Sequence, residues 1–349
     1  MIFSVVLIFL LVIGLIIIIV GISLLSPVIE DQLSGLPITQ DNIGGDFSSR
    51  QLAYVCSPVD QTVRAVDPST NRVVATLNFT EEPVIALPYP HGGDLYVAAG
   101  NNLYIVDGKS LSAMMNITYP YPLRNIAFSP DGSRAYVETS DGNISRIMVI
   151  NTETKDNLAR IPDMAGPGSD GMQVSPDGNY LYLTDGDHGS LVVIDLSNNT
   201  IMKSIPCSIV DGQASDVAVS HDGRHIYVSM WSSDELAVVS AENLTLEKTI
   251  HMPINNSRSV AVSPDGLYLY ATNYDDKKRI STVTVIDASD DTVLKEITIG
   301  MDPSSMRISP DGKYLYICTA YDPVQVINTE TMSVVKGPGF IGSHVEFRK

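Results

Sequence analysis

Polar and charged residues that could do chemistry recur at two adjacent positions of a repeated sequence pattern. The first position holds Arg124, Asp170, Ser215, Arg258, Ser304 and Ser343, and the second holds Asn125, Gly171, Asp216, Ser259, Ser305 and His344. Each pair precedes an apolar run that predicts a strand. If the repeats form a ring, these side chains converge at the mouth of its central channel and can bind a ligand. The alternative is a hydrated funnel with ordinary ion pairs. The ligand-site prediction consists of Arg124, Asn125, Asp170, Asp216, Arg258 and His344.

A second group of possible ligating residues is the segment Asp185-Gly-Asp187-His188-Gly. Two carboxylates and an imidazole this close together could bind a divalent cation. The same place in other repeats is also acidic, at Asp141, Asp234 and Asp322. Because aspartate side chains commonly stabilise turns, we favour a turn over a metal site.

No motif predicts a catalytic nucleophile. The chain lacks G-x-S-x-G, H-E-x-x-H and a Walker loop, and its six histidines are scattered. The cysteines Cys56, Cys207 and Cys318 show no metal-ligand spacing, so we expect small buried side chains and no disulfide. We therefore predict no catalytic residue and no cofactor.

The elements that position these residues follow from an internal repeat. Ser-Pro-Asp-Gly begins at Ser129, Ser175, Ser263 and Ser309, and Ser-His-Asp-Gly begins at Ser220. Degenerate copies begin at Phe47 and Tyr89, which gives seven copies with a mean spacing of about 44 residues. An aromatic and apolar strand pattern follows each copy, for example Tyr180 to Leu183. This period is typical of a four-stranded propeller blade.

The two ends of the chain complement each other. The first repeat starts directly at Leu52–Cys56 without an inner strand, and the chain finishes with His344–Phe347, which matches an inner strand. We expect the C-terminal strand to complete the first blade, because closure removes free sheet edges. The predicted fold is all-β: a seven-bladed propeller over residues 51–349.

The repeats resemble the YVTN-type β-propeller repeat, which is common in archaeal surface and surface-layer-associated proteins. The segments Ser263–Asn273 and Thr282–Asp287 carry this resemblance, and it extends over about residues 50–349. The resemblance implies an interaction role at the cell surface and no defined catalytic residues. The second repeat departs from the pattern at Pro90–Gly93, and the third departs at Glu138–Ser140.

The first residues of the chain predict a membrane anchor. Residues Ile2 to Leu25 contain no charged side chain. A helix of this length spans about 36 Å, enough to cross a hydrocarbon core of about 30 Å. A cleaved signal peptide is the alternative, but no basic residue precedes the segment. We expect an anchor over residues 1–26 and a linker rich in Pro, Gly, Ser and Asp over residues 27–50.

The charge of the chain argues against one class of partner. With 22 basic and 40 acidic residues, the net charge of −18 opposes nucleic-acid binding.

Glycosylation motifs predict the side of the membrane. N-x-[ST] sequons begin at Asn78, Asn116, Asn143, Asn198, Asn243 and Asn255. This is about twice the number expected from composition, which favours an extracellular propeller.

Three functions remain open. The first is a non-catalytic binding module whose partners are proteins or glycans of the cell envelope. The second is a propeller enzyme of lactonase or dehydrogenase-subunit type, with its site at the channel mouth. The residues to test for this function are Arg124, Asp170, Asp216, Arg258 and His344. The third is a structural component of the envelope.

Overall fold

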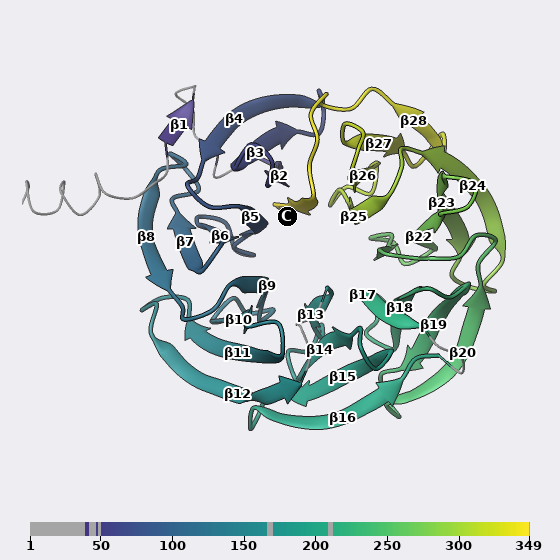
Figure 1. Ribbon diagram of the computed structural model, residues 1–349, viewed down its shortest axis with the longest axis horizontal. Coiled ribbons are helices and arrows are strands. Elements are labelled where there is room, and N and C mark those ends of the chain that lie inside the picture. Colours follow the sequence, from purple (N-terminus) through teal and green to yellow (C-terminus); the bar gives the residue numbers. More distant parts are fainter. Residues whose placement is uncertain (1–38, 42–46, 48–49, 166–169, 209–211, 349) are drawn as a thin grey trace, which may run out of the picture.

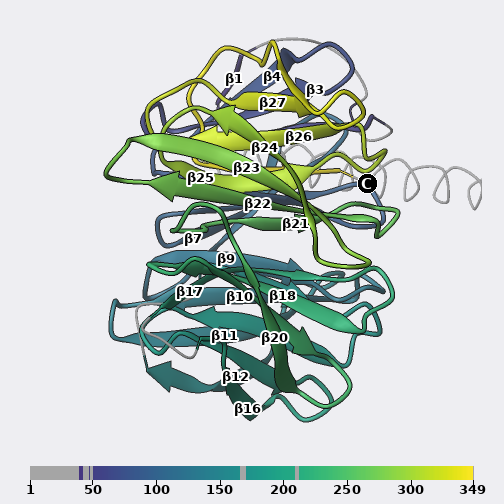
Figure 2. The ribbon, with the colours of Figure 1, turned by 90° about the vertical axis from the view of Figure 1, so that its right-hand side faces the viewer.

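Seven antiparallel sheets form a ring in the computed structural model, which describes residues 39–41, 47, 50–165, 170–208 and 212–348 (Figure 1). Within these ranges, every regular secondary-structure element is a β-strand. From the side, the inner strands run nearly along the ring axis and outer strands such as β20 and β24 cross it obliquely (Figure 2). This is the ordinary right-handed twist of a sheet. The predicted seven-bladed propeller is confirmed.

The blades are numbered along the chain, and each is given from its inner to its outer strand. Blade 1 contains β29 (His344–Phe347), β2 (Ala53–Ser57), β3 (Thr62–Asp67), β4 (Arg72–Asn78) and β1 (Thr39–Asp41). Blade 2 contains β5 (Pro83–Pro88), β6 (Leu95–Ala99), β7 (Asn102–Val106) and β8 (Ala113–Thr118). Blade 3 contains β9 (Leu123–Phe128), β10 (Arg134–Ser140), β11 (Ile144–Asn151) and β12 (Asn157–Ala165). Blade 4 contains β13 (Met172–Val174), β14 (Tyr180–Asp185), β15 (Ser190–Asp195) and β16 (Thr200–Pro206). Blade 5 contains β17 (Gln213–Val219), β18 (His225–Trp231), β19 (Glu235–Ser240) and β20 (Thr245–His251). Blade 6 contains β21 (Val260–Val262), β22 (Tyr268–Asp275), β23 (Ile280–Asp287) and β24 (Val293–Ile299). Blade 7 contains β25 (Pro303–Ile308), β26 (Tyr314–Thr319), β27 (Gln325–Asn328) and β28 (Ser333–Val335).

The Ser-Pro-Asp-Gly segment forms the turn between the first two strands of a blade. In blade 4, Ser175 Oγ donates a hydrogen bond to Asp177 at 2.5 Å and accepts one from the Tyr180 amide at 2.9 Å. Gly178 has a φ of +76°, a backbone conformation that only glycine adopts without strain. The serine thus stabilises the turn through its hydrogen bonds, and the glycine allows the positive φ that the turn requires. The aspartate orients the serine hydroxyl by accepting its hydrogen bond.

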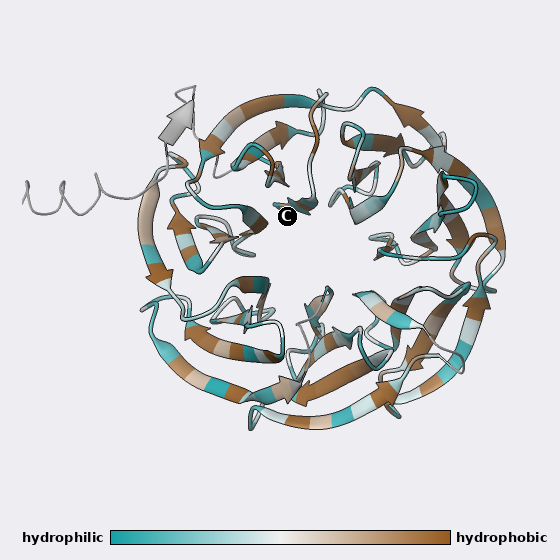
Figure 3. Ribbon diagram, in the orientation of Figure 1, coloured by the Kyte–Doolittle hydropathy of each residue, from teal (hydrophilic) through white to brown (hydrophobic). Residues whose placement is uncertain are grey.

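The hydrophobic core lies between blades. One cluster, for example, joins Tyr182 and Leu191 of blade 4 to Val217 and Val228 of blade 5. Strands inside the ring contain long hydrophobic stretches, whereas the outer strands mix hydrophobic and hydrophilic residues (Figure 3). The continuous apolar runs of the sequence are therefore strands buried on both faces, as expected for stacked blades.

Strand β29 closes the ring. It pairs antiparallel with β2, with Tyr54 opposite Glu346 and Cys56 opposite His344. The next residue, Arg348, is buried, and its guanidinium donates hydrogen bonds to the carbonyls of Phe47, Gly93 and Gly108. The predicted split blade is confirmed, and Arg348 ties it to blade 2.

The region predicted as a linker differs from the structure in one respect. Residues Thr39–Asp41 form β1, which pairs with the outer strand β4, and Phe47 is buried. An outer strand has unpaired amide and carbonyl groups along its edge, so a preceding segment can pair there without a hydrophobic signal of its own. The predicted membrane anchor lies outside the described residues, and no helix among the described residues could span a membrane.

Candidate functional site

The two aligned positions do occupy equivalent places in the blades. The amide of the second position donates a hydrogen bond to a hydroxyl on the neighbouring strand in three blades: Gly171 to Thr184, Asp216 to Ser229, and Ser259 to Thr272, all at 2.9–3.0 Å. These hydroxyls explain why small polar residues recur on that strand.

Serines at the first position connect adjacent blades. Ser215 Oγ donates to the carbonyl of Arg258 at 3.0 Å, and Ser304 Oγ donates to the carbonyl of Ser343 at 2.9 Å. Each bond satisfies a backbone carbonyl at the start of the next inner strand. The serines at this position are therefore structural.

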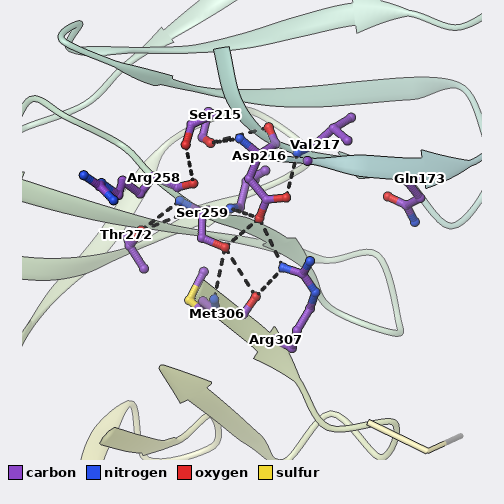
Figure 4. A network of polar contacts seen from close by, with 12 residues as sticks. Gln173, Ser215, Asp216, Val217, Arg258, Ser259, Thr272, Met306 and Arg307 are labelled. Carbon is purple, nitrogen blue, oxygen red and sulfur yellow. Dashed lines mark hydrogen bonds and ion pairs between the residues drawn. The ribbon is translucent and has the colours of Figure 1, made fainter. Parts of the chain in front are cut away.

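Asp216 of blade 5 is the acceptor at the centre of a polar network (Figure 4). Its Oδ2 atom accepts hydrogen bonds from Ser259 Oγ at 2.6 Å, Arg307 Nη1 at 3.1 Å and the Val260 amide at 3.3 Å. Its Oδ1 atom accepts one from the Val217 amide at 2.9 Å. The side chain is only 8% exposed, so these donors replace the water that it loses.

The network continues from Arg307 into blade 1. Arg307 Nε donates to Glu346 Oε1 at 2.9 Å, and His344 Nε2 lies 3.0 Å from the same oxygen. Burial alone would raise the pKa of Glu346, but Arg307 and His344 outweigh it and lower the pKa to about 2. Burial alone would lower the pKa of Arg307, but Glu346 and Asp216 raise it. The cluster of Asp216, Arg307, Glu346 and His344, which we call the axial network, joins blades 5, 7 and 1.

Arg307 and Glu346 were not among the predicted site residues. Each lies two residues after the second aligned position, and alternate residues of a strand face the same side. At this place Ala127, Ala218 and Ala261 are small and apolar, and Gln173 is polar but uncharged. Two charged residues in an otherwise uncharged row are the signal that would have identified them.

Three of the predicted residues remain at the mouth, by which we mean the axial end of the ring where the inner strands begin. Arg124 and Asp170 are exposed, and the Arg258 guanidinium lies 4.3 Å from the ring centroid of Trp231. The pKa of Asp170 is raised, and the largest cause is partial desolvation of its carboxylate by the surrounding protein. Arg258 opposes this rise, Asp216 adds to it, and Arg124 also opposes it. Neither arginine forms an ion pair with Asp170.

The six predicted ligand-site residues thus separate into distinct groups. Arg124, Asp170 and Arg258 lie at the mouth, where the two arginines oppose the rise in the pKa of Asp170. Asp216 and His344 belong to the axial network. Asn125 is buried within blade 3, where it pairs with Glu138 across the sheet.

The segment around Asp185 forms a turn. Its carboxylate accepts a hydrogen bond from the His188 amide at 3.2 Å and contacts His188 Nδ1 at 2.9 Å. Asp141 makes the equivalent turn, accepting from the amides of Asn143 and Ile144. No group of three or more His, Cys, Asp or Glu side chains in the described part of the chain is placed to hold a metal ion.

The three cysteines are free and buried, as expected. Cys56 packs in the cluster shared by blades 1 and 2, whereas Cys318 packs in the cluster shared by blades 7 and 1. The two thiols therefore belong to different interfaces. Burial raises the pKa of each thiol, that of Cys207 to about 12.

Most sequons have an exposed asparagine. The exposed ones are Asn116, Asn143, Asn198, Asn243 and Asn255, and the half-buried one is Asn78 at the end of β4. Five of the six asparagines are therefore accessible to a modifying enzyme.

Fold and network together define a seven-bladed β-propeller with a charged axial cluster. A family model described as "Lactonase, 7-bladed beta-propeller" matches residues 196–292, and a model of the LVIVD repeat matches residues 168–205. Each match covers less than half of the chain. They agree with the seven-bladed propeller fold and do not support the finer resemblance to YVTN-type surface proteins.

Similar proteins include an enzyme, part of an enzyme and a protein of unknown function. The chain is 26% identical over 196 residues to dihydro-heme d1 dehydrogenase of Pseudomonas aeruginosa. The aligned region covers 54% of this chain and only 37% of that protein. It superposes on hydrazine synthase of Kuenenia stuttgartiensis with a TM-score of 0.62 and 22% identity, over 71% of this chain and 77% of that one. It superposes on a functionally unknown protein of Desulfotomaculum acetoxidans with a TM-score of 0.73 and 12% identity, over 85% and 98%. At these identities the two structural likenesses show the fold alone.

Proposed function

We propose that the chain is a non-catalytic binding module whose ligand binds at the mouth. The observation that carries this proposal is that the acidic groups of the axial network are already engaged. Asp216 accepts four hydrogen bonds, and Glu346 is bonded to Arg307 and His344. Among the described residues, no ion pair joins Arg124, Asp170 and Arg258 at the mouth.

Proton transfer is a poor role for Glu346. A general base works best when its pKa is near the working pH. With a pKa of about 2, Glu346 stays ionised at neutral pH and is a weak base. We infer that Glu346 holds Arg307 and the closing strand in place.

We further propose that the propeller is membrane-anchored and extracellular. The uncharged segment from Ile2 to Leu25 and the five exposed sequons support this location. The net charge of −18 disfavours nucleic acid as a partner, which leaves proteins or glycans of the cell envelope.

Hydrogen–deuterium exchange of the full chain in detergent, with and without a solubilised envelope fraction from the native cell, tests the binding role. We expect slower exchange at the starts of β9 and β17 (Leu123 and Gln213) and at Ser304 in β25, with no change in the turns at the opposite end of the ring. Protection confined to the outer strands, or none, would contradict a site at the mouth.

Protease treatment of intact cells, combined with the intact mass of the purified chain, tests the location. Cleavage of the propeller from outside and added glycan mass are expected. A protected, unmodified chain would place the propeller on the other side.

A lactonase-type enzyme is the second candidate, favoured by the family match over residues 196–292 and by the raised pKa of Asp170. Measuring the acid released when the chain is incubated with each of a panel of lactones tests for this activity. Turnover that is lost in both Asp170→Asn and His344→Gln would establish the enzyme; turnover that neither change affects would remove its proposed site.

A further inference from the structure

Three exposed apolar side chains, which we call the apolar rim, lie on neighbouring loops at the mouth. Val59 is in the loop between β2 and β3 of blade 1, Tyr321 is in the loop between β26 and β27 of blade 7, and Ile341 is between β28 and β29. Their exposed fractions are 86%, 67% and 40%. The corresponding hairpin loops of blades 2 to 6 contain only polar residues and glycine. Exposed apolar residues concentrated on adjacent loops indicate a contact surface.

Contacts between the loops join blades 7 and 1 at this surface. The amide of Val324, in the loop of blade 7, donates a hydrogen bond to the carbonyl of Phe340 at 2.8 Å. The Phe340 ring centroid lies 4.5 Å from the guanidinium of Arg64, which forms an ion pair with Asp60. Asp60 directly follows Val59 in the loop of blade 1. The residues that carry the apolar rim therefore belong to one connected group of loops.

The described chain enters the propeller at the same end of blade 1. Strand β1 is the outermost strand of this blade (Figure 1). Thr39 lies opposite Asn78, Asn78 lies opposite Thr62, and Thr62 lies opposite Ser57. Because neighbouring strands are about 4.8 Å apart, this row spans about 14 Å from Thr39 to Ser57. Val59 lies two residues beyond Ser57, in the loop at the end of the row.

The length of chain before β1 limits which end of the ring can face a membrane. Residues 27–38 separate the predicted anchor from Thr39, and a flexible segment of this length spans about 20 Å on average. Strand β4 has seven residues and is therefore about 23 Å long. With the opposite end of the ring on the membrane, the short segment would have to run back along the whole height of blade 1. It therefore favours the mouth as the end nearest the bilayer.

We propose that the apolar rim docks on the bilayer that holds the predicted anchor. Tyr321 carries an aromatic ring and a hydroxyl, which suits the boundary between headgroups and acyl chains, and Val59 and Ile341 add apolar surface. The net charge of −18 opposes an anionic surface, so neutral, zwitterionic headgroups fit best. Three side chains bind a membrane weakly by themselves, but a short tether raises their effective concentration at its surface. This inference rests on the proposed anchor.

Fluorescence quenching on the full chain in phosphatidylcholine vesicles, with a spin label on the lipid near its headgroup, tests the docking. The fluorophore is attached to a cysteine introduced by Val59→Cys or by Leu267→Cys, since the three native thiols are buried. Leu267 is the matched control, because it is 57% exposed in the turn between β21 and β22, at the opposite end of the ring. We expect at least threefold stronger quenching at position 59 than at position 267.

Variants of the apolar rim test which side chains make the contact. Tyr321→Asp combined with Ile341→Asp should reduce quenching at position 59 to the level at position 267, because a carboxylate is costly to remove from water. Tyr321→Phe should leave the quenching unchanged. Quenching that survives both aspartates would overturn the role of the apolar rim.

The remaining outcomes separate docking from anchoring. A chain that floats with the vesicles but shows equal quenching at the two positions, or none, refutes the docking and leaves the anchor in place. A chain that does not float refutes both. A concentration-dependent dimer in detergent that Tyr321→Asp abolishes would assign the apolar rim to a second copy of the chain and overturn the proposal.

Discussion

One guanidinium balances two carboxylates from different blades near the axis of the ring. Arg307 contacts Asp216 in blade 5 and Glu346 in blade 1, and no more than 28% of any of these three side chains is exposed. Removing one partner of a buried pair leaves charge without compensation, which costs more than the pair contributes. The axial network is therefore most sensitive at Arg307.

We expect Arg307→Met to lower the free energy of unfolding by about 3 kcal/mol, because both carboxylates lose their cation. Denaturant unfolding of the purified chain measures this. Arg224→Gln, which alters an exposed arginine, should change stability by less than about 0.5 kcal/mol. Equal effects of the two changes would mean that the network contributes nothing specific.

Acid should weaken the network through Glu346. Its pKa is about 2 in the folded chain against an ordinary value of 4.5. The stabilisation is therefore complete above about pH 4.5 and is lost as the pH falls toward 2, and it amounts to about 3 kcal/mol for a shift of this size. We expect the stability difference between the wild type and Glu346→Gln to shrink between pH 5 and pH 3. A difference that does not depend on pH would contradict the role of this carboxylate.

At the scale of elements, the turns could be predicted from sequence and the outer strands only partly. Ser-Pro-Asp-Gly encodes its turn locally, through Ser175, Asp177 and Gly178 in blade 4. By contrast, the outer strands of six blades carry a β-bulge at the same place, which leaves one residue unpaired. The unpaired residues are Val74, Met114, Leu158, Met202, Glu247 and Leu294. Five of the six are apolar, like many other residues of the outer strands, so residue type alone does not mark a bulge, which depends on strand register.

Close backbone contact within blade 2 predicts a glycine requirement. A methyl group on Gly108 would overlap the carbonyl oxygen of Gly93 and crowd the Arg348 guanidinium. Since a carbonyl of the backbone cannot move aside as a flexible side chain can, Gly108→Ala should destabilise the chain by about 2–3 kcal/mol. Thermal unfolding measures this against Gly186→Ala, whose added methyl group meets nothing closer than 3.5 Å. Equal midpoints for the two variants would refute the close contact.

At the scale of the whole molecule, the ring could be predicted, but the contacts across it could not. Seven repeats and an unmatched strand at His344–Phe347 imply closure without any knowledge of side-chain positions. Arg307 and Asp216 are 91 residues apart, and their contact depends on the diameter and twist of the closed ring. The sequence therefore located Asp216 and His344 but assigned them to a ligand site, because their partners were not visible in the repeats.

Closure by β29 makes the whole ring depend on the last residues of the chain. Deleting residues 344–349 exposes the edge of β2, removes the buried side chains of Val345 and Phe347, and takes away Glu346 and Arg348. Together these losses match or exceed the total stability of a typical domain, about 5–15 kcal/mol. We expect the truncated chain to lose cooperative unfolding in circular dichroism.

A synthetic peptide of residues 344–349, added to the truncated chain, separates closure from general damage. It should restore cooperative unfolding in a concentration-dependent way, because it supplies the missing inner strand and both charged side chains. A peptide carrying Glu346→Ala and Arg348→Ala should restore less. A truncated chain that unfolds as cooperatively as the full one would show that six complete blades are sufficient without closure.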